Sequence, residues 1–141
     1  MAGDSSVLAP HPGSAPASTV WTPRVVLAED DGTCRSSLQR SLTRAGFRVV
    51  PAEDGRAALQ SILDWGADVL VTDLLMPGMD GAELLLRLSL AAPWVRCVAI
   101  TGAVQPEAWL LSARERGAVE TLSKPFTIEE LQAAIWRTLG R

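Results

Sequence analysis

Hydrophobic residues follow two different spacings along most of the chain. Short runs rich in valine, leucine and isoleucine, typical of buried strands, are separated by segments whose hydrophobic residues recur as on one face of a helix. In the segment 127–139, Ile128, Leu131, Ile135 and Leu139 share such a face. The pattern predicts strands in alternation with helices: strands at 24–28, 47–51, 67–73, 95–101 and 118–123, and helices at 33–45, 53–66, 82–92, 106–117 and 127–139.

Residues at the ends of the predicted helices support these boundaries. Thr127 and Glu130 have the spacing of a capping box, in which each residue satisfies a backbone N–H of the other. Pro106 stands at a first-turn position, where its missing N–H costs nothing. Gly46 and Gly66 follow two of the helical segments, where glycine commonly ends a helix.

Alternation of strands and helices indicates right-handed βαβ crossovers, and therefore a parallel sheet covered by helices on both faces. We predict an α/β fold with a doubly wound, five-stranded parallel sheet. The commonest strand order for such a sheet is 2-1-3-4-5, as in flavodoxin-like folds. Sites in these folds form beyond the carboxyl ends of the strands, near the first and third strands.

The first 23 residues differ from the rest. They are rich in proline, alanine, serine and glycine and show no hydrophobic periodicity, so we expect a flexible arm over 1–23. The arm lacks the basic start and continuous apolar stretch of a signal peptide. We expect one domain over 24–139, contacted by Val20 and Trp21, and no output domain in this chain.

Composition excludes several classes of function. No apolar run approaches the roughly 20 residues of a membrane span, and the net charge of −3 implies no basic face for nucleic acid. His11 is the only histidine and lies in the arm, which argues against a Ser-His-Asp triad and against His-ligated zinc. Cys34 and Cys97 have neither metal nor redox spacing, and we interpret both as core thiols in a reducing compartment. We therefore expect a cytoplasmic protein.

Polar residues follow four of the five predicted strands directly. Acidic residues that follow a strand often serve only to cap the next helix, and Asp31 fits this interpretation as well as a functional one. It fits Asp73 poorly, because no helix begins there, and it does not explain Lys124, which is the only lysine in the chain. The residues at the strand ends are Glu29, Asp30 and Asp31 after the first strand, Asp73 after the third, Thr101 after the fourth and Lys124 after the fifth.

Carboxylates that converge on one rim repel each other. At a separation of ~4 Å and an effective dielectric constant near 20, the repulsion is roughly 4 kcal/mol for each pair. Oxygen ligands without histidine or cysteine point to Mg²⁺ (or Mn²⁺) as the compensating cation, and Lys124 adds a second positive charge. Carboxylate, divalent metal, hydroxyl and ammonium together are typical of a phosphoryl-transfer site, with Asp73 as the candidate nucleophile.

Four motifs resemble the receiver domain of two-component response regulators over about residues 24–139: "VVLAEDD", "VTDLLMPGMDG", "AITG" and "LSKPF". The resemblance implies that Asp73 is the phospho-accepting aspartate. It implies that Asp30 binds Mg²⁺ directly, that Glu29 acts mostly through water, and that the backbone carbonyl of Leu75 is a further ligand. Gly78 and Gly81 fit turns of the loop after the third strand.

The remaining motifs of the family carry over in the same way. Thr101 matches the hydroxyl residue that bonds a phosphoryl oxygen, and Lys124 matches the lysine that pairs with the phosphoryl group. The resemblance also implies a cis bond between Lys124 and Pro125, which is an option open mainly to X–Pro bonds.

Under this resemblance the protein is a phosphorylation-activated switch of a two-component phosphorelay. A histidine kinase or phosphotransfer protein donates the phosphoryl group, and the protein catalyses only its own phosphorylation and dephosphorylation. The surface of the fourth helix, fifth strand and fifth helix then binds a downstream protein or a second copy of the chain. Trp109 and Trp136 lie on that side, as core residues or as contacts.

Three positions depart from the commonest family pattern. The switch position, often tyrosine or phenylalanine, falls at Thr121. Leu75 and Ala103 occupy the positions that flank the attacking water, and neither can orient it. The sequence therefore predicts slow self-hydrolysis of the phosphoryl group.

The residues present disfavour two other kinds of site. An aspartate-nucleophile phosphatase of the haloacid dehalogenase kind would need a second aspartate where Leu75 stands. A flavodoxin-like binder of a flavin phosphate would not place "EDD" in its first loop, because the carboxylates would repel the phosphate. The alternative that stays open is a receiver-like docking module that works without phosphorylation, and Thr121 leaves room for it.

Overall fold

The fold alternates strands and helices as predicted. The computed structural model describes residues 21–102, 106–115 and 120–141. The strands are β1 (Arg24–Ala28), β2 (Arg48–Ala52), β3 (Val69–Asp73), β4 (Arg96–Thr101) and β5 (Glu120–Ser123). The helices are α1 (Gly32–Arg44), α2 (Gly55–Trp65), α3 (Gly81–Ala91), α4 (Pro106–Glu115) and α5 (Ile128–Thr138). The expected arm lies outside the described residues except for its last three positions.

The strands form one parallel sheet in the order β2-β1-β3-β4-β5, which confirms the predicted fold. Val25 of β1 is in register with Val49 of β2 on one side and with Val69 of β3 on the other. Parallel pairing brings all carboxyl ends to one edge of the sheet, and this order makes β1 and β3 neighbours there. Whatever follows these two strands is therefore brought together by topology alone.

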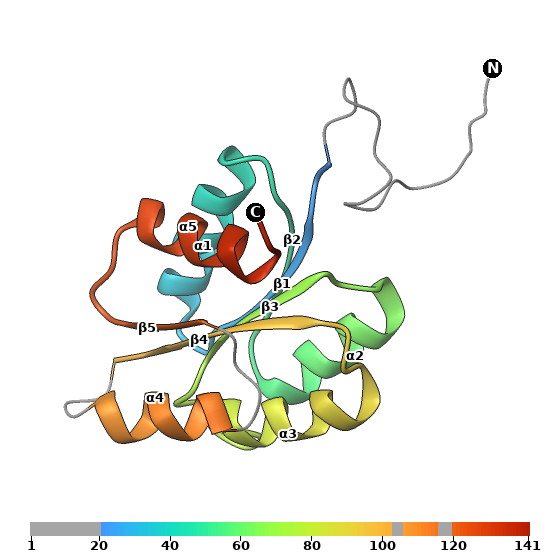
Figure 1. Ribbon diagram of the computed structural model, residues 1–141, viewed down its shortest axis with the longest axis vertical. Coiled ribbons are helices and arrows are strands. Elements are labelled where there is room, and N and C mark those ends of the chain that lie inside the picture. The colour runs from blue at the N-terminus through green and yellow to red at the C-terminus, as the bar shows by residue number, and fades with distance from the viewer. Residues whose placement is uncertain (1–20, 103–105, 116–119) are drawn as a thin grey trace.

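Helices cover both faces of the sheet, with α1 and α5 on one side and α2, α3 and α4 on the other (Figure 1). Side chains alternate along each strand, so each strand contributes to two cores. Val25 and Leu27 of β1 pack on the α1–α5 side, whereas Val26 and Ala28 pack on the α2–α3 side. Because both faces are covered, β3 is buried along its whole length, which explains its unbroken hydrophobic run.

Side-chain caps set where the helices begin. Asp31, Asp54, Asp80 and Thr127 each accept a backbone N–H from the first turn of the following helix, a contact worth about 1 kcal/mol. The predicted capping box at α5 is present. The predicted helix over 53–66 begins only at Gly55, because Asp54 is its cap rather than a member of its first turn.

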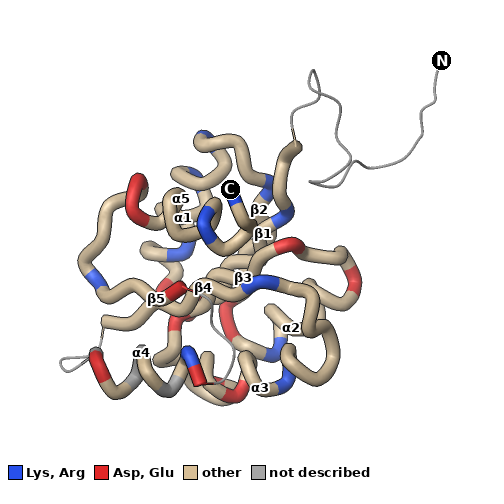
Figure 2. The backbone as a smooth tube through the Cα atoms, viewed as in Figure 1, with Lys and Arg blue, Asp and Glu red and all other residues tan. Residues whose placement is uncertain are grey.

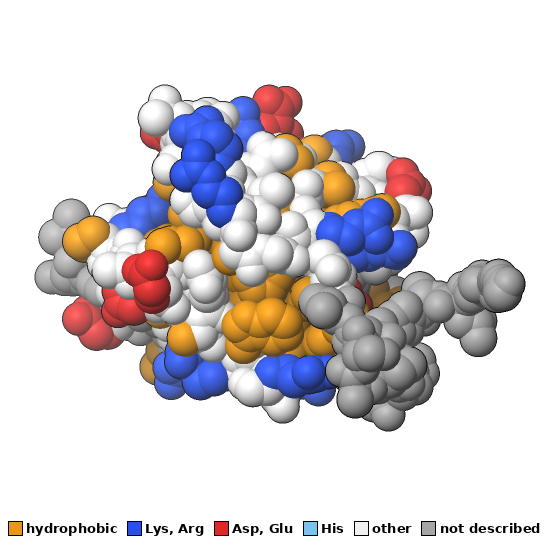
Figure 3. Space-filling view, turned by 90° about the horizontal axis from the view of Figure 1, so that it is seen from above, with side chains coloured by type: hydrophobic (Ala, Val, Ile, Leu, Met, Phe, Trp, Pro, Cys, Tyr) orange, Lys and Arg blue, Asp and Glu red, His pale blue; other side chains and the backbone are white. Residues whose placement is uncertain are grey.

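The residues just before β1 are attached to the domain. The ring of Trp21 meets that of Trp136 edge-on at 6.1 Å between centroids, and the ring centroid of Phe47 lies 5.3 Å from that of Trp136. The guanidinium of Arg141 stacks over Trp21 at 5.3 Å. The expected contact of Trp21 is thereby confirmed. Figure 3 shows one face of the molecule, on which hydrophobic side chains gather near the middle and Lys or Arg side chains lie around them.

The two cysteines differ in burial. Cys97 is buried, as expected for a core thiol, and burial raises its pKa to about 12. Cys34 is only partly buried, so its interpretation as a core residue was wrong. Burial is still the main cause that raises its pKa to about 11, and the nearby carboxylate of Glu29 acts in the same direction.

Charged residues of both signs occur on both sides of the sheet (Figure 2). Among the described helices, none is both long and apolar enough to cross a membrane.

Candidate functional site

Three carboxylates meet at the carboxyl edge of the sheet. Glu29 and Asp30 follow β1, and Asp73 is the last residue of β3. One carboxylate oxygen from each lies within 4.8 Å of the other two. We call these three residues the acidic pocket.

The pocket is half enclosed. Glu29 is 1% exposed and Asp73 is 4% exposed, whereas Asp30 faces solvent. The site is therefore enclosed by protein around Glu29 and Asp73 and open to solvent at Asp30. A ligand can therefore reach the pocket from the side of Asp30.

Lys124 joins the two buried carboxylates. Its ammonium donates to Asp73 Oδ2 at 2.8 Å and to Glu29 Oε1 at 2.9 Å. The contacts link the end of β5 to the ends of β1 and β3, so the sites predicted at three strand ends are one cluster. One ammonium against three carboxylates leaves the pocket net negative, which favours a further cation there.

Burial and charge act in opposite directions on these groups. Burial raises the pKa of Glu29, and the hydrogen bond from Lys124 offsets only part of this effect. Burial alone would lower the pKa of Lys124, but its hydrogen bonds to Asp73 and Glu29 outweigh burial and raise it above the ordinary value. Lys124 is therefore charged at neutral pH.

Both oxygens of Asp73 are held. Oδ2 accepts from Lys124, and Oδ1 accepts from the backbone N–H of Leu75 at 2.8 Å. Leu75 itself is 40% exposed. Asp73 is thus fixed in orientation before any ligand arrives.

Gly81 lets helix α3 approach the end of strand β3 closely. A Cβ at Gly81 would lie 2.4 Å from the carbonyl oxygen of Asp73 and 2.7 Å from Cα of Leu74. The expectation that Gly81 serves a turn was wrong, because it is the first residue of α3 and its role is close packing. Gly78 does lie in the loop, with a positive φ of 74° that favours glycine.

Backbone contacts orient the other residues predicted for the site. Thr101 is buried at the end of β4, and its carbonyl accepts from the backbone N–H of Lys124 at 2.7 Å. The Lys124–Pro125 bond is cis. Arg35 donates to the carbonyl of Glu29 at 2.8 Å and so braces the turn after β1. No feature of the sequence predicted the contact of Arg35, because an arginine in a first helical turn usually points to solvent.

The predicted switch position has a polar partner. The hydroxyl of Thr121 on β5 accepts from Nη2 of Arg114 on α4 at 3.1 Å. On the other side of β5, Arg137 of α5 forms an ion pair with Glu120 at 3.0 Å. Ala103 and the side chain of Trp109 lie outside the described residues.

The donor set is suited to a hard divalent cation. All side-chain donors of the pocket are carboxylate oxygens, and Mg²⁺ is usually held by one or two carboxylates plus waters. No histidine or thiol belongs to the cluster, which disfavours zinc. The chemistry of the residues present therefore fits a Mg²⁺ site.

Comparison with known proteins matches this chain to one family. Residues 25–136 match the family model described as the response regulator receiver domain. The chain is 34% identical over 116 residues to the DNA-binding transcriptional regulator NtrC of Escherichia coli strain K12. This match covers 82% of the chain and 24% of NtrC. It is 35% identical over 118 residues to response regulator MprA of Mycolicibacterium vanbaalenii, covering 84% of this chain and 51% of that protein. The chain thus spans a quarter to a half of the length of these relatives.

Solved structures give the same result. The structure of FixJ-N is 33% identical with a TM-score of 0.79, and the match covers 86% of this chain and 97% of that one. The receiver domain of Francisella response regulator 1452 is 27% identical with a TM-score of 0.78, and the match covers 85% and 98%.

Proposed function

Because the chain belongs to the response regulator receiver domain family, we propose that it is a signalling switch controlled by phosphorylation of Asp73. The phosphoryl group comes from a histidine kinase or phosphotransfer protein of a two-component phosphorelay. The observation that carries the proposal is the placement of Asp73 between two further carboxylates and the ammonium of Lys124.

Asp73 supplies the nucleophile. One of its carboxylate oxygens attacks the phosphorus of a phosphohistidine, a P–O bond forms, and the P–N bond breaks with its electron pair remaining on the histidine nitrogen. The hydrogen bonds from Leu75 and Lys124 hold the carboxylate in place for this approach. The attack needs no base, because a carboxylate nucleophile carries no proton that must be removed.

Glu29, Asp30, Asp73 and the carbonyl of Leu75 are the residues that would hold Mg²⁺. When bound, the cation neutralises negative charge on the transferring phosphoryl oxygens. Lys124 and the hydroxyl of Thr101 bind oxygens of the phosphoryl group once it is on Asp73. Lys124 thereby exchanges a carboxylate partner for a phosphoryl partner.

Phosphorylation of Asp73 alters the surface formed by α4, β5 and α5. Thr101 ends β4, and Thr121 lies on the neighbouring strand, so a change at Thr101 is one strand away from the contact between Thr121 and Arg114. This surface then binds a downstream protein or a second copy of the chain. The protein acts in the cytoplasm, without nucleic acid or membrane contact, and has no enzymatic activity beyond its own phosphorylation and dephosphorylation.

One observation favours a second candidate, a docking module that works without phosphorylation. Thr121 is held by an arginine from α4 and has no aromatic ring to change position. A module of this kind would keep the fold and the α4–β5–α5 surface but would not respond to a phosphoryl group.

Beryllofluoride, a mimic of the phosphoryl group, separates the two candidates. We expect it to bind in the presence of Mg²⁺ and to give a bound ¹⁹F NMR signal that is absent in Asp73→Asn. The α4–β5–α5 backbone resonances should shift at the same time. Binding without shifts on that surface, or no binding at all, would favour the docking module.

A further inference from the structure

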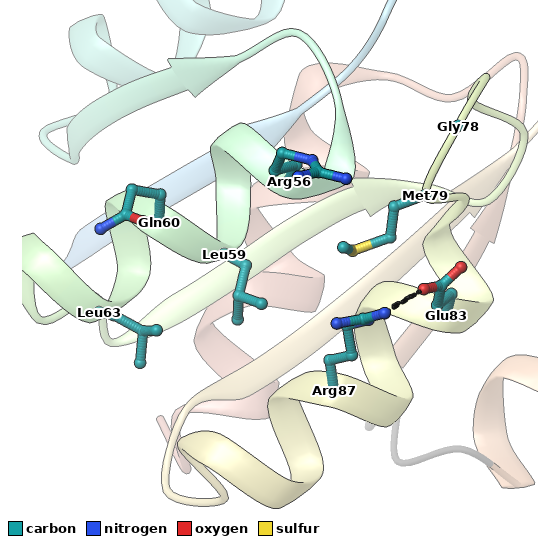
Figure 4. Close-up of a pocket in the computed structure, with 8 residues that line it drawn as sticks. All are labelled: Arg56, Leu59, Gln60, Leu63, Gly78, Met79, Glu83 and Arg87. Atoms are coloured by element: carbon teal, nitrogen blue, oxygen red, sulfur yellow. Dashed lines mark hydrogen bonds and ion pairs between the residues drawn. The ribbon is translucent and has the colours of Figure 1, made fainter.

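A groove runs between helices α2 and α3, outside the acidic pocket. It has a volume of about 380 Å³ and is closed at one end by the loop after β3 (Figure 4). We call it the α2–α3 groove. Its lining includes Arg56, Leu59, Leu63, Glu83 and Arg87. None of them belongs to the acidic pocket.

Large hydrophobic side chains are exposed on α2, on α3 and just beyond α3, and one of them, Leu63, lines the groove. Leu63 of α2 is 53% exposed, and Leu86 and Leu90, one turn apart on α3, are 47% and 80% exposed. Trp94, just beyond the end of α3, is 71% exposed. Single exposed leucines are ordinary, but an exposed tryptophan with three leucines on two neighbouring helices is typical of a contact surface.

These side chains are not needed to fill the core. On α2, Gly55, Ala58 and Ile62 are the buried residues, and Leu59 packs against the same core from the groove side. On α3 the buried residues include Leu84, Leu85 and Leu88. The exposed leucines therefore leave apolar area that nothing among the described residues covers.

The charge of the groove selects the kind of partner. Arg87 forms an ion pair with Glu83 at 2.8 Å, so the only carboxylate of the lining is already compensated. Arg56 at the first turn of α2 has no hydrogen bond or ion pair within the part of the chain that the structure describes. The groove thus offers one uncompensated guanidinium above an apolar floor, and a guanidinium favours carboxylates of a partner.

We propose that the α2–α3 groove and the adjoining face of α3 bind an acidic amphipathic helix of a partner protein. A groove between two helices accepts a third helix, whose apolar face covers Leu63 and Leu90 and whose carboxylates reach Arg56. The interaction uses none of the residues assigned to phosphoryl transfer. It is a docking contact separate from the α4–β5–α5 surface.

The test uses a synthetic helical peptide of roughly three heptads of leucine and glutamate, labelled for fluorescence anisotropy. The protein is the full chain, unphosphorylated and without Mg²⁺. We expect the peptide to bind and to shift backbone resonances of α2 and α3 in NMR spectra. Arg56→Glu and, separately, Leu90→Ser should each weaken binding by about tenfold or more. Both residues are exposed, so neither change disturbs the core.

Matched controls make the result decisive. Arg44→Glu, an equal charge reversal on the exposed end of α1, should leave the affinity unchanged. A peptide with lysine in place of glutamate should bind at least about tenfold more weakly. Failure of the acidic peptide to bind, equal binding of the lysine peptide, or equal loss in Arg44→Glu would overturn the proposal. If the chain forms a dimer that Leu90→Ser dissociates, the face binds a second copy of the chain instead, and this result would also overturn the proposal.

Discussion

The two carboxylate oxygens of Asp73 have different partners. One accepts a backbone N–H and the other a buried ammonium, so the carboxylate is oriented by two elements at once. The identity of these residues could be predicted from the sequence, because acidic and basic side chains at the ends of parallel strands converge whatever their rotamers. Their hydrogen bonds could not, because a choice of partner depends on distances of a few ångströms.

Leu75 allows a test of the phosphoryl lifetime. Leu75 is 40% exposed next to Asp73. Because its side chain is apolar, it can neither donate a hydrogen bond to an attacking water nor accept one from it. We expect Leu75→Gln to shorten the lifetime of phosphorylated Asp73 several-fold, because an amide can orient that water. The decay of phosphorylated protein, followed by intact mass after the phosphodonor is removed, measures it. Leu75→Met, which is flexible but apolar, should leave the decay unchanged, and a faster decay in Leu75→Met would contradict this account.

Among the elements, the first residue of a helix depends on which nearby residue acts as its N-cap. Asp31 caps α1, Asp54 caps α2 and Asp80 caps α3. The sequence predicted where helices lie but not that Gly81 allows α3 to pack closely against the end of β3. A packing glycine and a turn glycine look alike in sequence, because only the neighbouring backbone distinguishes them.

Gly81→Ala should therefore destabilise the fold. The new methyl group would meet backbone atoms of Asp73 and Leu74 that cannot move away without shifting β3. We expect the free energy of unfolding to fall by about 1–3 kcal/mol, as for other overpacked sites. Urea denaturation measures the change.

Gly32→Ala is the matched control, because Gly32 is likewise the first residue of a helix. A Cβ there would meet only the flexible end of Arg35, at 3.5 Å. Its free energy of unfolding should stay equal or rise slightly, since alanine favours the helix over glycine. Equal losses in both variants would mean that close packing at Gly81 is not the cause.

For the molecule as a whole, we expect folding and metal binding to be linked. The unfolded chain has no acidic pocket, so Mg²⁺ held by the pocket would stabilise the folded state alone. At a concentration ten times its Kd, the gain is about 1.4 kcal/mol, which raises Tm by roughly 4–6 °C for a domain of this size.

Asp30→Asn should remove most of this rise while leaving the fold intact, because Asp30 faces solvent. Differential scanning calorimetry with Mg²⁺ and with EDTA measures both proteins. Na⁺ at matched ionic strength is the control for screening. A rise in Tm of the same size in Asp30→Asn would place the metal elsewhere.

The order of the sheet and the cluster at its edge were both predictable, since alternating elements restrict the topology. The contacts of Arg114 with Thr121 and of Arg35 with the turn after β1 were not. Each joins long, flexible side chains to a neighbour that the hydrophobic pattern does not specify. The groove between α2 and α3 also depends on side chains that the pattern treats as an ordinary solvent-facing side.

Intact mass spectrometry shows whether Asp73 accepts a phosphoryl group. The full chain is incubated with acetyl phosphate and Mg²⁺. We expect a gain of one phosphoryl group that disappears with EDTA and in Asp73→Asn. No gain in the unaltered protein, or a gain that persists in Asp73→Asn, would contradict the assignment of Asp73 as the phosphoryl acceptor.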